Sequence, residues 1–419
     1  MANYKMAEAN SRIIPLEDKI FGINKLAKEM IAKEGTDQVV NATIGSLLDD
    51  HGNLVVLSSV VDVLKNLTAT DYADYAPIGG TADFQRDVKK AAFGNFQPTC
   101  FTEAIATPGG TGAIRNTIQN YSKRGDQVLT SDWYWGPYNT IAQEIERTIA
   151  TYTLFDEDGK FNIASFDRKV KELLEKQDGL VIILNTPAHN PTGYTLTDND
   201  WDLALNSIKE ATADGKKKVT LLVDVAYIDF AGNGEKYRSF YPKLENLPTN
   251  ILVIIGFSMS KGYTMYGMRG GAMICMTSDK EIADEFKTVC AFSCRGSWSN
   301  CTRASMVALS NIYADQALLD KVTAERAIHC EMLIRRGQTF QAAADEIGLK
   351  TVPFDSGFFL VVPCEHAEEV GKELQKNGIF TVPLGKGLRV SVASVSEERC
   401  KVLPQKMLEA IDKVTGLHQ

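Results

Sequence analysis

The 419-residue sequence lacks several features that would assign it to a specialised class of protein. It has no run of about 18 apolar residues, so it contains no candidate transmembrane helix. Residues 1–20 lack the apolar core of a signal peptide and are typical of an amphipathic arm. An excess of basic residues is also absent, and the net charge of -8 argues against nucleic acid or an anionic membrane as the main partner.

Cysteines with the spacing of a zinc site are missing as well. The eight cysteines are scattered, and even Cys290, Cys294 and Cys301 form no C-x-x-C pair. We therefore expect no metal site, and we expect reduced thiols in a cytoplasmic protein. The sequence also has no internal repeat and no low-complexity tract.

The sequence does have the composition and the pattern of a soluble α/β protein, with 44% hydrophobic and 23% charged residues. Continuous apolar runs, typical of strands that are covered on both faces, occupy residues 127–132, 180–185, 219–227, 251–258 and 271–276. Helical patterns at 166–177 and 199–215 alternate with them, which predicts a mostly parallel sheet. In such a sheet a ligand binds beyond the carboxyl ends of the strands.

The length of the chain and its C-terminal pattern indicate a second, smaller domain. At 419 residues the chain is too long for one simple core. Residues 312–346 predict one long helix, kinked near Gly337, that leads out of the large domain. Residues 358–363 and 388–393 are short strand candidates in the domain that follows.

A lysine follows the predicted strand 251–258, in the stretch GFSMSKGYTMYGMRGG. Ser258 and Ser260 precede Lys261, and Arg269 comes eight residues after it. A strand that runs into a polar surface loop would give the same pattern, because lysine and arginine are usually solvated. The alternative is a lysine at the mouth of the sheet, with hydroxyl groups and an arginine beside it.

Three other segments carry groups that would complement this lysine. In ATPGGTGAIR a glycine-rich turn opens a helix, and the backbone N–H groups of such a turn favour an anion, although many such turns bind nothing. Asp224 lies in the apolar run LLVDVAY, where a carboxylate is costly unless a cation or a donor meets it. The turn NTPAHNPTG displays Asn190 at the end of another strand.

Together these segments predict a site with an anion cradle, a buried acid, an amide and an amine nucleophile. Pyridoxal 5′-phosphate requires this set of groups. Its phosphate binds N–H groups, hydroxyls and arginine, its aldehyde reacts with lysine, and its ring nitrogen pairs with an acid. We therefore expect this cofactor.

The same segments resemble those of the class I aminotransferases of the aspartate/aromatic type. The similar motifs run in order from about residue 39 to 394: VVNATIGSLLDDHGN, YADYAPIGG, TPGGTGAIR, NTPAHNPTG, DVAYIDF, SMSKGYTMYGMRGG, RGSWSN and LRVSVA. The resemblance implies the α/β architecture called fold type I, in which helices sandwich the mostly parallel sheet of a large domain. It implies that the N-terminal arm and part of a small α+β domain span 1–60, the large cofactor-binding domain 61–315, and the interdomain helix and small C-terminal domain 316–419.

The resemblance also implies roles for individual residues. Lys261 would form the Schiff base with the cofactor and would also move a proton between substrate and cofactor. Asp224 and Tyr227 would be the other catalytic residues. The implied cofactor ligands are Gly110, Thr111, Trp135, Asn190, Asp224, Tyr227, Ser258, Ser260, Lys261, Arg269 and, from a neighbouring subunit, Tyr75. The implied substrate ligands are Gly45, Asn190, Arg295 and Arg389. A homodimer with shared active sites follows from Tyr75.

The implied reaction is a ping-pong transamination between L-aspartate or an aromatic L-amino acid and 2-oxoglutarate. Arg295 would cross the dimer to bind a distal carboxylate, which favours dicarboxylic substrates without excluding aromatic ones. It could also be an ordinary surface arginine. A β-lyase or an amino-acid decarboxylase on the same fold is the alternative reaction.

At three places the sequence departs from the family motifs or fits them in more than one way. The histidine that supports the aspartate in this family is absent, and the sequence offers Tyr138, Asn139 or His189 in its place. The tryptophan that stacks on the cofactor is predicted to be Trp135, with Trp133 as the other register. The loop around residues 49–51, which holds Asp49 and His51 near the substrate, does not identify the amino-acid donor.

Overall fold

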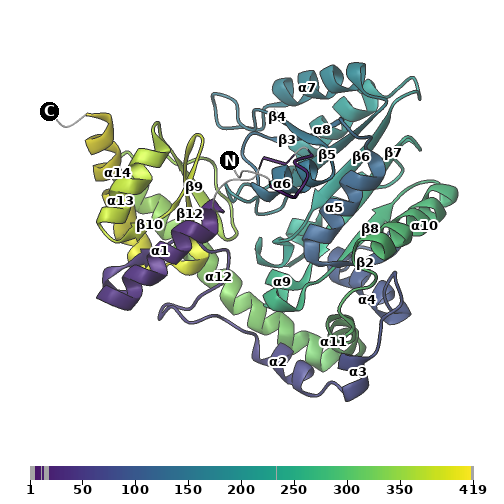
Figure 1. Cartoon of the computed structure of the whole chain (residues 1–419), viewed down its shortest axis with the longest axis horizontal. Coiled ribbons are helices and arrows are strands. Elements are labelled where there is room, and N and C mark those ends of the chain that lie inside the picture. The colour runs from purple at the N-terminus through teal and green to yellow at the C-terminus, as the bar shows by residue number, and fades with distance from the viewer. Residues whose placement is uncertain (1–4, 11, 14–17, 233, 417–419) are drawn as a thin grey trace.

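The computed structural model describes residues 5–10, 12–13, 18–232 and 234–416 (Figure 1). Its helices and strands form two groups, which are linked by the long helix α12 (Gln316–Glu346). Within these residues, no helix has both the length and the hydropathy of a membrane span.

A seven-stranded sheet forms the centre of the larger group. Its strand order is β2, β8, β7, β6, β5, β3 and β4. All neighbouring strands are parallel except for the pairs that β8 makes with β2 and β7. The strands are β2 (Ala104–Pro108), β3 (Gln127–Ser131), β4 (Thr148–Tyr152), β5 (Gly179–Asn185), β6 (Lys218–Asp224), β7 (Ile251–Ser258) and β8 (Gly270–Met276). The five strands that the continuous apolar runs predict are present, and β2 and β4 add to them.

Helices cover both faces of this sheet, as the alternation of residues along β5 shows. Ile182 packs in the core beneath α7 and α8, whereas Val181 and Ile183 pack in a second core beneath α5 and α10. Because both faces are buried, the strands need no polar alternation, and their sequences are continuously apolar. The helices are α5 (Gly109–Tyr121), α7 (Ile163–Lys176), α8 (Asp198–Ala211) and α10 (Lys280–Ser297).

The smaller group combines segments from both ends of the chain. Ala42 shares a core with Phe340 and Leu360, which confirms that N- and C-terminal segments build one α+β unit. Its elements are α1 (Lys19–Glu34), β1 (Val40–Asn41), β9 (Phe359–Pro363), α13 (Ala367–Lys376), β10 (Ile379–Phe380), β11 (Val382–Leu384), β12 (Gly387–Ser391) and α14 (Glu397–Thr415). β12 lies between β11 and β9 in an antiparallel sheet, and β1 pairs with β10 in parallel. The predicted domain boundaries at 60 and 315 stay predictions.

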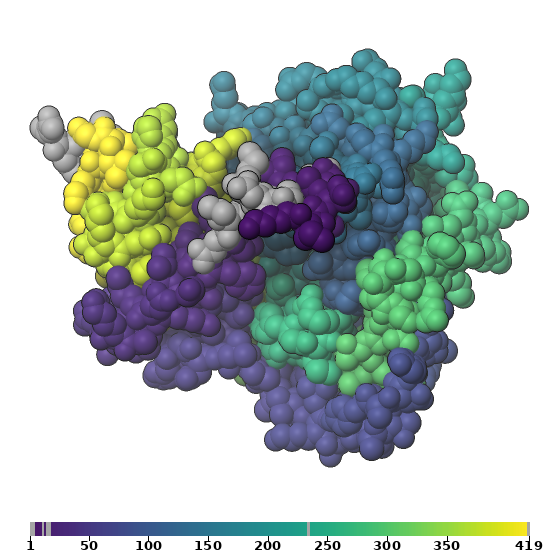
Figure 2. Space-filling model, in the orientation of Figure 1, coloured from purple at the N-terminus to yellow at the C-terminus, as the bar shows by residue number. Residues whose placement is uncertain are grey.

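The N-terminal segment lies across the larger group in Figure 2, where its dark purple residues cover part of the blue surface. Arg12 forms an ion pair with Glu144 at 2.8 Å. Residues 1–4, 11 and 14–17 of the predicted amphipathic arm lie outside the described residues. The remaining helices are α2 (Ser58–Lys65), α3 (Ala69–Ala73), α4 (Ala82–Phe93), α6 (Pro137–Glu144), α9 (Met259–Gly262) and α11 (Arg303–Ala314).

The prediction of one helix over residues 312–346 is wrong at its start. α11 ends at Ala314, and Asp315 begins α12 by accepting a hydrogen bond from the Leu318 N–H at 3.2 Å. An aspartate in this capping position satisfies a backbone donor that has no partner within the helix. α12 then continues through Gly337, where a Cβ atom would lie only 2.3 Å from the Phe354 ring.

We expect Gly337→Ala to destabilise the protein by about 1–3 kcal/mol, because overpacking against Phe354 outweighs the gain of roughly 1 kcal/mol in helix propensity. The midpoint of urea denaturation measures this effect. Gln338→Ala is the matched control, because Gln338 is exposed on the same helix and its change should leave the midpoint nearly unmoved. A Gly337→Ala protein as stable as the wild type would contradict the close contact.

Candidate active site

The candidate site lies at the edge of the large sheet where the parallel strands end. Asp224 and Ser258 are the last residues of β6 and β7, and Asn185 is the last residue of β5. β2 ends at this edge too, since it and β7 are both antiparallel to β8. Groups that are far apart in the sequence therefore meet here, as expected for a sheet of this type.

A cavity of about 210 Å³ opens at this edge. All the predicted cofactor ligands except Tyr75 line it, and Ile114, Asn185 and Ala226 line it in addition. The lining residues are Gly110, Thr111, Ile114, Trp135, Asn185, Asn190, Asp224, Ala226, Tyr227, Ser258, Ser260, Lys261 and Arg269. Of the two tryptophans, Trp135 lines the cavity, while Trp133 packs in the core beneath α7 and α8.

The glycine-rich turn and the arginine form one end of the cavity. α5 begins at Gly109 without a side-chain cap, so its first N–H groups face an anion-binding position. Gly109 has φ +68°, its N–H donates to the Arg269 carbonyl at 2.9 Å, and a Cβ atom here would lie 2.7 Å from Arg269 Nη2. Arg269 Nη1 also donates to Ser260 Oγ at 3.4 Å. This cradle of backbone N–H groups, hydroxyls and a guanidinium suits a phosphate.

Lys261 follows β7 in the short helix α9, and its side chain stays partly exposed to the cavity. The Ser258 side chain caps this helix by accepting a hydrogen bond from the Ser260 N–H at 3.3 Å. Lys261 Nζ lies 5.1 Å from the centre of the Tyr227 ring. Burial lowers the pKa of Lys261 to about 8, with a further decrease from Arg269 and an opposing increase from Asp224. The neutral, nucleophilic amine is therefore accessible near neutral pH.

Asp224 is buried, and two donors hold its carboxylate. Asp224 Oδ2 accepts a hydrogen bond from Tyr138 Oη at 2.6 Å, and Oδ1 accepts one from the Ala226 N–H at 3.1 Å. Burial raises the pKa of Asp224 despite these donors and the nearby charge of Lys261. Of the candidates named in the sequence, Tyr138 is thus the one that bonds to the Asp224 carboxylate. His189 bonds to Thr192 Oγ1 at 2.8 Å instead.

Asn190 and Tyr227 form the opposite wall. Asn190 Nδ2 donates to Tyr227 Oη at 3.4 Å, and the Asn190 N–H donates to Asn185 Oδ1 at 2.7 Å. Asn185 Nδ2 in turn donates to the Asp224 carbonyl at 2.9 Å. Asn185 is therefore a supporting residue that the sequence motif contained and the prediction missed.

Arg389 lies on β12 and joins the smaller group to the site. Its side chain is buried, with Nη1 donating to Asn190 Oδ1 at 3.3 Å and Nη2 to the Thr43 carbonyl at 2.8 Å. Arg389 Nε is buried without a partner among the described residues, and burial lowers the pKa of the guanidinium to about 10. Gly45, two residues after Thr43, has its Cα close to the Phe359 ring, which an added Cβ would meet at 3.0 Å. A buried cation with a free donor is suited to a carboxylate.

Besides Gly45 and Arg389, two more predicted site residues do not line this cavity, namely Tyr75 and Arg295. Tyr75 is 82% exposed. Arg295, near the end of α10, is also exposed and donates to Ser299 Oγ at 2.6 Å. Their predicted roles belong to the active site of a neighbouring subunit and stay predictions.

A family model described as aminotransferase class I and II matches residues 37–407. The chain belongs to this family. The mitochondrial aspartate aminotransferase of Gallus gallus is 24% identical over 95% of this chain and 92% of its own length. That of Schizosaccharomyces pombe is 28% identical over 68% of this chain and 63% of its own length. The crystal structure of an aminotransferase from Anaerococcus prevotii shares 39% identity and a TM-score of 0.95, over 98% of this chain and 100% of that chain.

The predictions of family, fold type and enzyme class are confirmed by these similarities, and the cofactor is pyridoxal 5′-phosphate. An aromatic-amino-acid aminotransferase of Burkholderia pseudomallei, 19% identical with a TM-score of 0.79, is described as covalently bound to pyridoxal phosphate. The residues of this aminotransferase fit that group. The cavity combines the uncapped start of α5, the amine of Lys261 and the buried carboxylate of Asp224.

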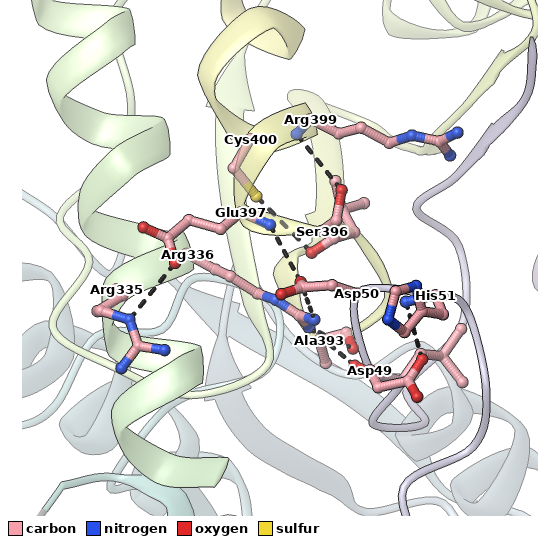
Figure 3. A network of polar contacts seen from close by, with 12 residues as sticks. Asp49, Asp50, His51, Arg335, Arg336, Ala393, Ser396, Glu397, Arg399 and Cys400 are labelled. Carbon is pink, nitrogen blue, oxygen red and sulfur yellow. Dashed lines mark hydrogen bonds and ion pairs between the residues drawn. The ribbon is translucent and has the colours of Figure 1, made fainter. Parts of the chain in front are cut away.

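A polar network ties the loop after Gly45 to the linking helix of the aminotransferase (Figure 3). Arg336, on α12, is fully buried, and its Nη2 donates to Asp50 Oδ1 at 2.8 Å. Its Nη1 donates to the carbonyls of Leu48 and Ala393 at 3.0 and 3.2 Å. One arginine thus fixes both the loop that carries Gly45 and the turn that follows the strand of Arg389.

The Asp49 side chain forms hydrogen bonds within the same loop. Asp49 Oδ1 accepts hydrogen bonds from the N–H groups of His51 and Asn53 at 2.9 and 2.8 Å. These bonds close a tight turn, and Leu48 and Leu54 form an antiparallel bridge at its base. A contact between Asp49 or His51 and the substrate stays a prediction.

We expect Asp50→Asn to lower the free energy of unfolding by about 1 kcal/mol at pH 7, because a charged partner of the buried Arg336 is replaced by a neutral one. Partial burial raises the pKa of Asp50, but the hydrogen bond and the charge of Arg336 outweigh this effect. The net result is a pKa below the ordinary value of an aspartate. The stabilisation is therefore present above about pH 4 and is lost as the pH falls through the folded-state pKa.

Urea denaturation midpoints of Asp50→Asn and wild type, measured from pH 7 down to pH 3, check this dependence. Glu397→Gln is the control, since its partner Arg335 forms an exposed pair with it and such pairs contribute little. Equal midpoints for Asp50→Asn and wild type at pH 7 would contradict the assigned ion pair.

Proposed function

We propose that this enzyme transfers the amino group of an aspartate-like or aromatic L-amino acid to 2-oxoglutarate. The observation that carries the proposal is the buried, partly unpaired guanidinium of Arg389 in a site whose nucleophile is Lys261. Both amino acids and 2-oxo acids carry a carboxylate next to the reacting carbon. One arginine that is held by Thr43 and Asn190 can therefore bind donor and acceptor in turn.

The residues of the cavity divide between holding the cofactor and moving protons. Pyridoxal 5′-phosphate, when bound, supplies an electrophilic carbon and an electron sink. Lys261 would hold the cofactor covalently and would take and return the proton at the α-carbon of the substrate, which its lowered pKa favours. Asp224 would stabilise positive charge at the ring nitrogen, and Tyr227 and Asn190 would donate hydrogen bonds to the ring oxygen.

The other ligands fix the position of the cofactor. Trp135, which lines the cavity, would stack on the ring, and the Gly45 backbone would bind the substrate carboxylate. The phosphate ligands in this proposal are Gly110, Thr111, Ser258, Ser260 and Arg269. Ser258, Ser260 and Arg269 belong to the same segment as Lys261. This segment would therefore anchor both the phosphate and the lysine.

A homodimer with shared active sites completes the proposal. The exposed Tyr75 would bind the phosphate of the partner's site, and the exposed Arg295 would bind the distal carboxylate of a dicarboxylic substrate there. The relatives named aspartate aminotransferase support the dicarboxylic substrate. The cytoplasmic localisation stays a prediction.

We expect the purified holoenzyme to show a yellow absorption band that one L-amino acid bleaches and 2-oxoglutarate restores. L-aspartate, L-glutamate and L-tyrosine are added separately, without an acceptor, and the visible spectrum is recorded. Lys261→Ala is the control and should show no turnover, because the proton-transferring amine is gone. Release of pyruvate, ammonia or carbon dioxide from a protein that stays yellow would contradict transamination.

A pair of arginine variants tests how the substrate is bound. We expect Arg389→Gln to lower kcat/KM by about a hundredfold or more for every amino acid, since it removes a buried charge partner. We expect Arg295→Gln to lower kcat/KM for L-aspartate and to leave that for L-tyrosine nearly unchanged. Steady-state kinetics with both donors measures these effects. An equal loss for both donors in Arg295→Gln would contradict the role of Arg295.

A further inference from the structure

Tyr138 is a buried tyrosine in contact with the carboxylate of Asp224. It lies in the first turn of α6, and its side chain is only 1% exposed. Its hydroxyl donates to Asp224 Oδ2 at 2.6 Å, the shortest of the hydrogen bonds described above for the site. Burial, followed by the charge of Asp224, raises the pKa of Tyr138 well above its ordinary value. The hydroxyl group is therefore a permanent donor.

The surroundings of Tyr138 fix the direction of this hydroxyl. The Tyr134 ring stacks at 6.4 Å with an interplanar angle of 5°. The Trp135 ring meets Tyr138 edge-on at 5.5 Å and 87°. The Tyr138 N–H also donates to the Trp135 carbonyl at 2.9 Å. The two ring contacts and the backbone hydrogen bond hold Tyr138 in one orientation. Its hydroxyl is therefore already directed at Asp224.

Asp224 retains acceptor capacity toward the cavity. A carboxylate has about four lone-pair sites, and the described contacts use one on each oxygen, from Tyr138 and from Ala226. Both donors favour the charged carboxylate, whereas burial opposes it. Replacing the tyrosine hydroxyl by hydrogen would remove one of only two donors that oppose the cost of burial.

A neutral donor at this point differs physically from the histidine that the family pattern places there. An imidazole can bring its own positive charge, which would compete with a cationic ligand for the same carboxylate. His189 does not take this part, since it bonds to Thr192 and burial lowers its pKa to about 3. Among the described residues, the hydrogen-bond donors to the Asp224 carboxylate, Tyr138 and the Ala226 N–H, are therefore neutral, and neither competes as a cation with a charged ligand.

We propose that Tyr138 is the positioning residue that keeps Asp224 ionised and aimed at the protonated ring nitrogen of the cofactor. The inference rests on the proposed function of Asp224 as the partner of that nitrogen. Tyr138 does not touch the cofactor in this account. Its hydroxyl acts through Asp224, and its ring supports Trp135.

The test compares two ligands that differ only at the ring nitrogen. Apoenzyme is titrated with pyridoxal 5′-phosphate and with its 1-deaza analogue, in which a C–H group replaces the nitrogen, and dissociation constants are measured by protein fluorescence. Tyr138→Phe keeps the aromatic contacts and removes only the hydroxyl. Tyr134→Phe is the matched control, because it removes the hydroxyl of the stacked neighbour, which makes no contact with Asp224 among the described hydrogen bonds.

We expect wild type and Tyr134→Phe to prefer pyridoxal 5′-phosphate over the deaza analogue. Tyr138→Phe should weaken binding of pyridoxal 5′-phosphate by about tenfold to a hundredfold, as loss of a hydrogen bond to a charged group does, and leave binding of the analogue within about threefold. In an Asp224→Asn background the same change should add little, which a double-mutant cycle measures.

Equal weakening of both ligands by Tyr138→Phe would show a merely structural role and overturn the inference, as would unchanged preference for pyridoxal 5′-phosphate. A wild-type enzyme that binds both ligands equally would instead refute the proposed role of Asp224 itself. The two failures are thus distinguishable. Circular dichroism of each variant establishes that the comparison is made between folded proteins.

Discussion

The active site depends on a pair of opposite charges, Lys261 and Asp224, held at the ends of neighbouring strands in a cavity of limited solvent access. β6 and β7 are paired so that Asp224 lies opposite Gly256, which places the acid and the amine at the same edge. Burial raises the pKa of the acid and lowers that of the amine, so each group resists the charge it carries in water. A cationic ring would pair with the acid, and an electrophilic carbon would react with the neutral amine. These properties support the proposed binding of pyridoxal 5′-phosphate in this cavity.

The rest of the fold keeps this pair in place. The antiparallel strand β8 brings Arg269 beside Gly109, so the phosphate cradle forms at the same edge as the lysine. On the other side, Arg336 and Arg389 reach from the helix and strand of the smaller group. The loop near Gly45 is held by both groups, since the Leu47 N–H also donates to Tyr266 Oη at 3.0 Å. The substrate position is therefore defined jointly by segments that are distant in sequence.

Much of the fold could be predicted because the buried strands are continuously apolar and end in recognisable motifs. β2 and β4 escaped prediction for physical reasons. β2 has only five residues and runs directly into the glycine-rich turn, while β4 lies at the edge of the sheet and is partly exposed. The boundary between α11 and α12 was missed because a capping aspartate at Asp315 interrupts an otherwise helical pattern without any glycine or proline.

The candidate site was predictable where one motif supplies one residue, as with Lys261 and Asp224, which both line the cavity. It was not predictable where a residue only supports another site residue by a hydrogen bond, because such contacts depend on how the elements pack together. Tyr138, Asn139 and His189 were all candidates in the sequence, and the hydrogen bond from Tyr138 to Asp224 distinguishes Tyr138 from His189, which bonds to Thr192. Asn185 was missed for the same reason, since its side chain bridges Asn190 and the backbone of Asp224.

The central claim is that Lys261 is the residue that binds the cofactor covalently. Borohydride reduction of the holoenzyme, followed by proteolysis and mass spectrometry, tests it most directly. We expect a phosphopyridoxyl group on the peptide that contains Lys261 and on no other lysine. A label on a different lysine, or no label on a protein that contains the cofactor, would contradict it.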